Sequence, residues 1–496
     1  MLKEISRRVF LVGAVTALGT IVQAGAPAVS LRPKARPGGN RAPNAPAAAA
    51  LIDEARLGGD VSFSVIDVKT GLLLEGYEAR SGLPPASVTK AVTALYALDV
   101  LGPGYRFETR LVATGPVRNG VIEGDLVLAG GGDPVLDTNA LADLAAGLKS
   151  AGVREVRGRF RTWGGALPFA RVVDADQPEH VGYNPSVSGL NLNFNRVHFE
   201  WRRSGNGYSV AMDARSDKYR PAVRVARMSV ADRRAPVYTY RDGGDHDSWS
   251  VARGALGNGG SRWLPVRRPE AYAAEVFAGF ARSHGIVLRY AGAAGTAPGG
   301  TVVARHRSAP LTDLLRDMLK YSNNLMAEAI GMTASARRKG RPVDLAASGR
   351  EMSQWARRSL EMQGASLVDH SGLGVDSRLS ASAMAGALAR VHRSGQLKPI
   401  LKPIAMKDAN GRVTKSHPVK VTAKTGTLYF VSALAGYATA EDGTELAFAI
   451  FTANTRRRGA INSKQAERPE GSVGWNRRAK RLQQRLIERW SKVYGS

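Results

Sequence analysis

The sequence predicts a multidomain α/β (α+β) protein in which a large β-rich insertion interrupts one domain. Three observations support this. The chain has 496 residues, which is roughly three domains at about 150 residues each. Strand-like and helix-like segments are mixed towards both ends of the chain. Between them the pattern changes to short strands separated by Gly and Asn turns. We therefore expect residues 50–112 and 269–496 to form one split domain, with an inserted β-rich part at 113–268.

The N-terminus predicts export. Ser6-Arg7-Arg8-Val9-Phe10-Leu11 is a twin-arginine pattern, and an apolar stretch follows it to about Val22. Small residues near Ala26 offer a cleavage site, so residues 1–28 are interpreted as a twin-arginine-type export signal. An uncleaved anchor is the alternative, although the stretch is short for a membrane span. Residues 29–49, rich in Pro and Ala, are predicted to be a linker, and the protein is expected in the periplasm or another extracytoplasmic space.

Composition narrows the function classes. Lys and Arg total 70 against 42 Asp and Glu, so the formal net charge is +28, which favours polyanionic partners. The basic residues gather at the termini, with twelve basic and three acidic residues from Arg456 onward. With an export signal and no dense basic stripe elsewhere, we expect no nucleic-acid partner. Peripheral membrane contact through the basic C-terminus is a hypothesis. The absence of Cys excludes disulfides and thiol catalysis, and no metal or organic cofactor is expected.

The first predicted elements lead to a helix that begins with a serine. Val61–Asp67 and Leu72–Tyr77 are predicted to form a hairpin, and Ser87–Val100 has apolar residues at helical spacing. Ser87 and Lys90 lie three residues apart in the first turn, so their side chains share a face. A nucleophilic serine needs a neighbouring base, and lysine can act as one when burial or another cation lowers its pKa.

The rest of the chain is predicted to alternate helices and strands. Helical spacing is found at Ala140–Ala151, Ala271–Ser283, Pro310–Thr333, Ala346–Gly364 and Ala381–Arg393. Strands are predicted at Lys420–Lys424, Ala433–Thr439 and Leu446–Ala453. The terminal segment is predicted to be a helix with Ala479, Leu482, Leu486 and Trp490 on one apolar face.

Two later motifs accompany Ser87-Val88-Thr89-Lys90. Tyr321-Ser322-Asn323-Asn324 contains S-x-N, and Lys424-Thr425-Gly426-Thr427 contains K-T-G. S-x-x-K, S-x-N and K-T-G in this order are the signature of penicillin-recognising serine enzymes. Lys69-Thr70-Gly71 also matches K-T-G, but it precedes Ser87 and is interpreted as a hairpin turn. Tyr321-Ser322-Asn323 also fits a Y-x-N motif of another β-lactamase class. One residue turns a helix by about 100°, so both registers cannot face the nucleophile.

The chemistry of these residues suggests a role for each. Ser322 would relay a proton between Lys90 and the leaving amine, and Asn324 would hold the amide of the substrate. Lys424 would bind a terminal carboxylate, and its positive field would lower the pKa of Lys90. Backbone N–H groups of the nucleophile and of Thr427 would form an oxyanion hole. The candidate catalytic residues are Ser87, Lys90 and Ser322, and the candidate substrate-binding residues are Asn324, Lys424, Thr425, Gly426 and Thr427.

With these motifs the chain resembles the D-alanyl-D-alanine carboxypeptidase/endopeptidase family, the class C low-molecular-mass penicillin-binding proteins of the penicillin-binding protein 4 type. Ser87 and Ser322 lie 235 residues apart, and a long insertion there is typical of this family and not of compact β-lactamases. Shorter matches within residues 50–455 are Gly131-Gly132-Asp133-Pro134, Tyr183-Asn184-Pro185 and Asp369-His370-Ser371-Gly372-Leu373. The chain departs from the family at Asn323, where Asp is usual, and at His370 and Phe430.

The resemblance implies a transpeptidase/β-lactamase-like catalytic domain and a serine D-Ala-D-Ala carboxypeptidase, with D,D-endopeptidase activity as a related reaction. The expected substrates are peptidoglycan stem peptides, cleaved through an acyl-enzyme at Ser87, and penicillins are expected as covalent inhibitors. A serine β-lactamase and a non-enzymatic cell-wall-binding protein are the alternatives. The insertion and the lack of an E-x-x-L-N motif count against the first, and the three ordered motifs count against the second.

Overall fold

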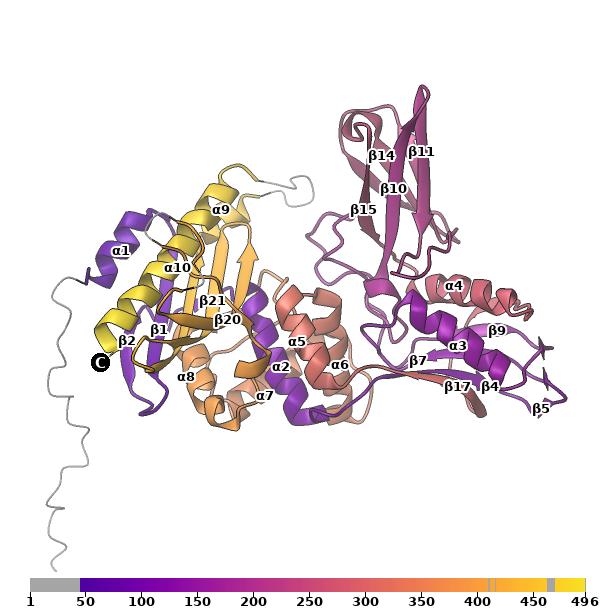
Figure 1. The fold of residues 1–496 in the computed structure, drawn as a ribbon, viewed down its shortest axis with the longest axis horizontal. Coiled ribbons are helices and arrows are strands. Elements are labelled where there is room, and N and C mark those ends of the chain that lie inside the picture. The colour runs from indigo at the N-terminus through magenta and orange to yellow at the C-terminus, as the bar shows by residue number, and fades with distance from the viewer. Residues whose placement is uncertain (1–44, 409–410, 415, 462–468, 496) are drawn as a thin grey trace, which may run out of the picture.

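The computed structural model describes residues 45–408, 411–414, 416–461 and 469–495 (Figure 1). The predicted export signal, residues 1–28, and residues 29–44 of the predicted linker lie outside this range. Helix α1, Ala48–Ala55, already begins within the last residues assigned to the linker. No helix in the described ranges is both long enough and apolar enough to cross a membrane.

A six-stranded antiparallel sheet is the centre of the catalytic part, with the strand order β19-β20-β21-β22-β1-β2. It joins the two ends of the chain, because β1 pairs with β22 along its whole length, for example Phe63 with Ile450. The strands are β1 (Asp60–Asp67), β2 (Leu73–Tyr77), β19 (Lys402–Pro403), β20 (Lys420–Leu428), β21 (Val431–Thr439) and β22 (Glu445–Ala453). This pairing shows why similar patterns recur at both ends of the sequence.

Helices cover both faces of this sheet (Figure 1). On one face lie α1 and α10 (Ser472–Tyr494). The predicted apolar face of α10, with Ala479, Leu482, Leu486 and Trp490, is buried there, and so is Trp475. The other face carries α2 (Thr89–Leu101), α5 (Leu311–Tyr321), α6 (Asn324–Lys339), α7 (Leu345–Ser359) and α8 (Ala381–Val391). Strands β21 and β22 are therefore buried on both sides, which accounts for their almost continuous apolar sequence.

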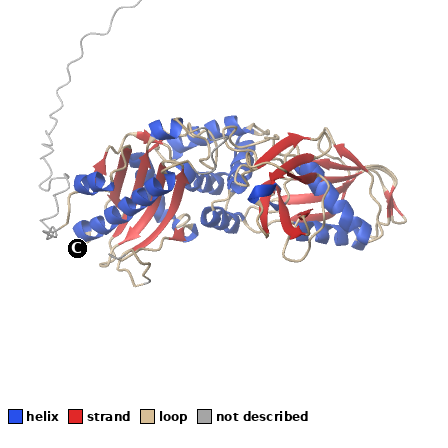
Figure 2. Cartoon of the chain, turned by 90° about the horizontal axis from the view of Figure 1, so that it is seen from above, coloured by secondary structure: helices blue, strands red, loops and turns tan. Residues whose placement is uncertain are grey.

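The inserted part contains a second sheet and a projecting β-rich region (Figures 1 and 2). Its main sheet has the order β16-β9-β7-β4-β17, formed by β4 (Glu108–Ala113), β7 (Leu126–Gly130), β9 (Phe160–Trp163), β16 (Tyr290–Ala293) and β17 (Thr301–Arg307). Helices α3 (Thr138–Ser150) and α4 (Pro269–Ser283) pack against it. The projecting region has two three-stranded sheets, formed by β10 (Arg196–Ser204), β11 (Gly207–Asp213), β12 (Ala226–Ala231), β13 (Tyr238–Asp242), β14 (Asp247–Ala252) and β15 (Gly259–Pro265).

Short elements complete the chain. The remaining strands are β3 (Gly82–Leu83), β5 (Val117–Arg118), β6 (Val121–Ile122), β8 (Glu155–Val156) and β18 (Leu379–Ser380). The remaining helices are the short α9 (Thr455–Gly459) and the 3-10 turns η1 (Ala86–Val88), η2 (Asn193–Asn195), η3 (Arg253–Ala255), η4 (His392–Ser394) and η5 (Lys398–Ile400).

The inserted part is larger than the predicted range of 113–268. Strand β4 pairs with β7 and β17, and residues of α4 such as Tyr272 and Phe277 are buried in the core of the insertion. Residues 108–307 therefore pack together, and the expectation that 108–112 and 269–307 belong to the catalytic part is wrong. Helix α4 resembles the helices that follow it in sequence, so only its packing partners show where it belongs.

The predicted helix Pro310–Thr333 is interrupted at the S-x-N motif. Ser322 has a left-handed backbone, φ 57°, and ends α5. Asn323 then caps α6, because its side-chain oxygen accepts a hydrogen bond from the Met326 N–H at 3.1 Å. The motif thus lies in a break between two helices, and the rotation of a continuous helix no longer decides which residue faces Ser87.

Candidate active site

Ser87 lies in the 3-10 turn η1, immediately before α2. Lys90 is in the first turn of α2, and its side chain is completely buried. The Lys90 Nζ donates a hydrogen bond to the Ser87 Oγ at 3.0 Å. The structure therefore brings together the hydroxyl and the amine whose spacing predicted a nucleophile and its base.

The ammonium of Lys90 has two further acceptors. Its Nζ donates to the Asn324 Oδ1 and to the backbone carbonyl of Ser371, both at 2.7 Å. A lysine ammonium has three N–H groups, and these three contacts match that number. The structure thus places Asn324, from the start of α6, beside Lys90, and it adds the Ser371 carbonyl, which was not among the candidate site residues.

Burial is the main cause of the altered pKa of Lys90. It lowers this pKa to about 8, while the negative charges of Glu328 and Asp369 act in the opposite direction. The sequence left two causes open, burial and a neighbouring cation such as Lys424, and burial is the one that lowers this pKa in the structure. A lysine with such a pKa is partly unprotonated near neutral pH, as a general base requires.

Lys424 is the second buried cation of the site, and it is 1% exposed. Its Nζ donates to the Ser322 Oγ at 3.0 Å and to the Thr425 carbonyl at 2.7 Å. Burial lowers the pKa of Lys424 to about 6, and repulsion from Lys90 and Lys402 adds to this effect. An anion bound here would supply a counter-charge that favours the protonated form.

Strand β20 and the loop after α7 approach the serine turn very closely. A Cβ atom on Gly426 would lie 2.7 Å from the Pro85 carbonyl oxygen, and one on Gly372 would lie 1.8 Å from that of Ala86. Gly372 also has a positive φ of 74°, so glycine is needed there for two reasons. The approach of β20 places Thr425, half-buried, and Thr427, exposed, beside the site.

The middle motif faces the site through Ser322. Its hydroxyl contacts Lys424, whereas the side chain of Tyr321 is 67% exposed and lies beside Lys320, with 4.8 Å between the Lys320 Nζ and the ring centroid. This arrangement favours the Ser322 register over the Y-x-N register. The earlier K-T-G match is an exposed turn between β1 and β2, in which the Thr70 N–H donates to the Asp67 Oδ1 at 2.8 Å.

Four contributors to the site were not found from the sequence. The Ser371 carbonyl binds Lys90, and the Tyr183 carbonyl, from the inserted part, accepts a hydrogen bond from the Asn324 Nδ2 at 2.7 Å. Glu328 and Asp369 are buried acids whose charges act on Lys90. The segments containing Tyr183, Asp369 and Ser371 resemble the family, but contacts through backbone carbonyls and long-range charges produce no motif of their own.

A pocket of about 260 Å³ opens next to the serine turn, between the catalytic and inserted parts. It is lined by Pro84, by Asp176 and Gln177 of the insertion, and by Val375, Asp376, Arg378, Thr455, Arg458, Gly459 and Ile461 of the catalytic part. The inserted part therefore helps to line this pocket, which contains none of the motif residues, and it contacts Asn324 through the Tyr183 carbonyl.

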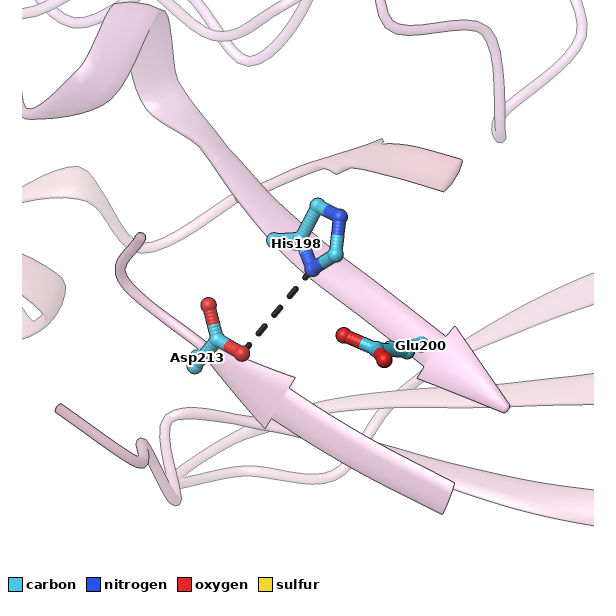
Figure 3. A group of neighbouring side chains, drawn as sticks. All are labelled: His198, Glu200 and Asp213. Atoms are coloured by element: carbon cyan, nitrogen blue, oxygen red, sulfur yellow. Dashed lines mark ion pairs between the residues drawn. The ribbon is translucent and has the colours of Figure 1, made fainter. Parts of the chain in front are cut away.

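One group in the described ranges has side chains that could hold a metal ion: His198, Glu200 and Asp213, on β10 and β11 (Figure 3). Their candidate ligand atoms lie within 4.8 Å of one another. However, Arg215 donates to the Glu200 Oε2 at 2.6 Å and to the Asp213 Oδ2 at 2.9 Å. Since a guanidinium already occupies an oxygen of each carboxylate, we assign no metal site there.

Comparison with known proteins agrees with this geometry. The chain is 25% identical over 442 residues to the D-alanyl-D-alanine carboxypeptidase DacB of Haemophilus influenzae, covering 83% of this chain and 89% of that protein. It is 28% identical over 442 residues to the D-alanyl-D-alanine carboxypeptidase of Actinomadura sp. strain R39, covering 81% of this chain and 79% of that one. The alignments span both the catalytic and the inserted parts.

Solved structures show the same fold. The crystal structure of penicillin-binding protein 4 from Haemophilus influenzae covers 89% of this chain and 99% of its own, with a TM-score of 0.71 at 20% identity. A second structure of that protein holds a β-lactam. The predicted fold class is confirmed. The profile of the D-Ala-D-Ala carboxypeptidase 3 (S13) family matches residues 44–477, so the chain belongs to that family and is a serine peptidase, as the motifs and the resemblance predicted.

Proposed function

We propose that Ser87 is the nucleophile with which this D-Ala-D-Ala carboxypeptidase cleaves peptidoglycan stem peptides. The observation that carries the proposal is the 3.0 Å hydrogen bond between the Ser87 Oγ and a fully buried Lys90. Burial favours the neutral amine, which can accept the hydroxyl proton as the oxygen attacks. The side chain of Lys69, in the earlier K-T-G match, is exposed to solvent.

The reaction proceeds in two halves. In the first, the Ser87 Oγ bonds to the carbonyl carbon of the penultimate D-Ala, its proton passes to Lys90, and the amide C–N bond breaks. The leaving amine of the terminal D-Ala takes a proton from Lys90 through the Ser322 hydroxyl. In the second half, water attacks the ester, its proton returns through Lys90 to Ser87, and the shortened peptide leaves. Cleavage of a cross-link would follow the same steps with a larger leaving amine.

Substrate binding would use the other residues of the site. Lys424 would bind the terminal carboxylate of the substrate, assisted by Thr425 and Thr427. The bound carboxylate would favour the protonated form of this buried lysine. Gly426 lets β20 approach the serine turn, so that N–H groups of Ser87 and Thr427 would stabilise the oxyanion. The Asn324 Nδ2 has a second hydrogen for an amide carbonyl of the substrate, beyond the one that it donates to Tyr183. Penicillins would acylate Ser87 because the lactam resembles the scissile amide.

Replacement of the nucleophile tests the proposal most directly. Ser87→Ala should abolish both D-alanine release and labelling by a fluorescent penicillin, while the near-UV circular dichroism spectrum stays unchanged. In the wild-type protein the label should be lost slowly, whereas rapid loss would indicate a β-lactamase. Labelling of the Ala variant at the wild-type rate would refute the assignment.

The two K-T-G matches provide a matched pair of lysines. Lys424→Ala should lower the second-order rate constant of penicillin acylation by about 10²-fold, since a hydrogen bond to a charged group contributes about 1.5–3 kcal/mol. Lys69→Ala removes a lysine from an exposed turn and should leave the rate constant within twofold. Stopped-flow measurement of the acylation rate constants of both variants tests this. A large loss in Lys69→Ala and none in Lys424→Ala would mean that the wrong K-T-G motif was chosen.

The middle motif can be tested in the same assay. Ser322→Ala removes the proposed relay, and general acid–base groups contribute about 10²- to 10⁴-fold. Tyr321→Phe removes a hydroxyl from a mostly exposed ring and should change acylation by less than threefold. A larger loss in the Phe variant would support the Y-x-N register and the β-lactamase alternative.

We further propose that the protein acts outside the cytoplasm, in the periplasm or its equivalent, and touches an anionic membrane surface. The twin-arginine pattern at residues 6–11 supports export. The apolar face of α10 is buried against the sheet, while Arg477, Arg478, Lys480 and Arg481 on its other face are exposed. Contact with lipid would therefore be electrostatic and weakened by salt.

Cell fractionation tests both points. Replacing Arg7 and Arg8 by Lys should retain the protein in the cytoplasm of a host that has twin-arginine export. The exported wild-type protein should sediment with membranes at low salt and be released by about 0.5 M salt, where the screening length is only a few ångströms. Normal export of the double variant would disprove the signal assignment, and membrane binding that resists salt would disprove the electrostatic contact.

A further inference from the structure

Glu328 is a completely buried carboxylate that the proposed reaction does not use. It lies on α6 four residues after Asn324, so both side chains project from one face of the helix. Asn324 contacts Lys90 directly. Glu328 instead binds the backbone of the loop that follows α7, because its Oε2 accepts the His370 N–H at 3.0 Å and its Oε1 accepts the Ser371 N–H at 2.9 Å.

The carbonyl groups of the same two residues are held by α2. The Thr93 hydroxyl donates to the His370 carbonyl at 2.7 Å, and the Lys90 Nζ donates to the Ser371 carbonyl at 2.7 Å. Two consecutive residues are thus held both by their N–H groups, which bind Glu328, and by their carbonyl groups, which bind Thr93 and Lys90. Within this clamp, Glu328 is the member whose hydrogen bonds set the orientation of the carbonyl that receives Lys90.

We infer that Glu328 is a positioning residue for acylation, which holds the Ser371 carbonyl against the Lys90 Nζ through its hydrogen bonds to the His370 and Ser371 N–H groups. The inference rests on the proposed role of Lys90 as the base. Because the three N–H directions of an ammonium are fixed relative to one another, the Ser371 and Asn324 acceptors together direct the third towards the Ser87 Oγ.

Several charged groups act on Lys90, and each bears on its proton affinity. Glu328, from α6, and Asp369, from the loop, both raise its pKa against the effect of burial. Burial also raises the pKa of both acids, that of Glu328 to about 8. Lys424, from β20, is a like charge whose own pKa is lowered by Lys90. Asp369 is held by the Gly372 and Gly374 N–H groups, both at 2.6 Å, while burial lowers the pKa of His370 to about 3 and leaves it neutral.

Replacement of Glu328 should therefore change the pH dependence of acylation. Because the pKa of Glu328 is itself raised to about 8, the acid limb of the wild type reflects the titration of Lys90 and Glu328 together. In Glu328→Gln the charge that raises the pKa of Lys90 is lost, so the acid limb should move to lower pH. Glutamine also offers an NH₂ group to one of the two backbone N–H groups, so the loop loses its alignment, and the plateau rate constant should fall about tenfold or more.

The experiment compares penicillin acylation between pH 5 and pH 10 for the wild type, Glu328→Gln, Glu328→Asp and Glu351→Gln. Glu351 is the matched control, since it is also buried, on α7, but pairs with Arg338 and Lys339. Its replacement should lower the unfolding temperature without moving the acid limb. Glu328→Asp keeps the charge on a shorter side chain, so it should lower the plateau while the acid limb stays in place.

The outcomes separate this inference from the proposed function. A wild-type protein that is not labelled at any pH would refute the role of Ser87 and Lys90. A labelled wild type with superimposable profiles for Glu328→Gln and Glu351→Gln would overturn the role of Glu328 alone. If Glu328→Gln shows no cooperative unfolding, Glu328→Asp decides, because a wild-type plateau in that variant would equally overturn the positioning role.

Discussion

The burial of one ammonium group is the constraint on which the rest of this structure depends. Lys90 is removed from water completely, and burying an unpaired charge is very costly. The structure compensates through Ser87, Asn324 and Ser371, which come from the serine turn, the start of α6 and the loop after α7. These segments are far apart in sequence, so the hydrogen bonding of this one group requires the catalytic part to be assembled around it.

Close backbone packing makes that assembly rigid. The serine turn is enclosed between β20 and the loop after α7, with glycines at 426 and 372 where a side chain would collide with it. Ala86, within the turn, has a positive φ of 46°, a conformation that is uncommon for residues other than glycine. The sheet and its two helical layers hold this conformation, as expected where backbone strain is kept at a functional site.

The insertion is part of the active site and does not merely extend from it. Its Tyr183 carbonyl takes one hydrogen of the Asn324 amide, while the oxygen of that amide accepts from Lys90. An amide held at both ends cannot rotate without losing both contacts, so the inserted part fixes the orientation of a residue in the catalytic part.

Local side-chain chemistry could be predicted from the sequence. Ser87 and Lys90 are three residues apart, and helical geometry alone brings them together. The apolar patterns of β21, β22 and α10 likewise predicted which residues are buried, because each strand or helix must bury its own apolar face. Ser322 and Lys424 were identified by motif order, and the structure brings them into contact with each other at 3.0 Å.

Tertiary structure decided the features that depend on partners distant in sequence. The insertion begins at β4 and ends after β17, because these strands pair with each other, and no local pattern reveals that pairing. The helix break at Ser322 requires a left-handed backbone conformation, and a serine at that position does not predict this conformation. The depressed pKa of Lys90 results from burial, and its third acceptor is a backbone carbonyl, which every residue possesses. Sequence thus determined which side chains could react, and packing determined their charge and direction.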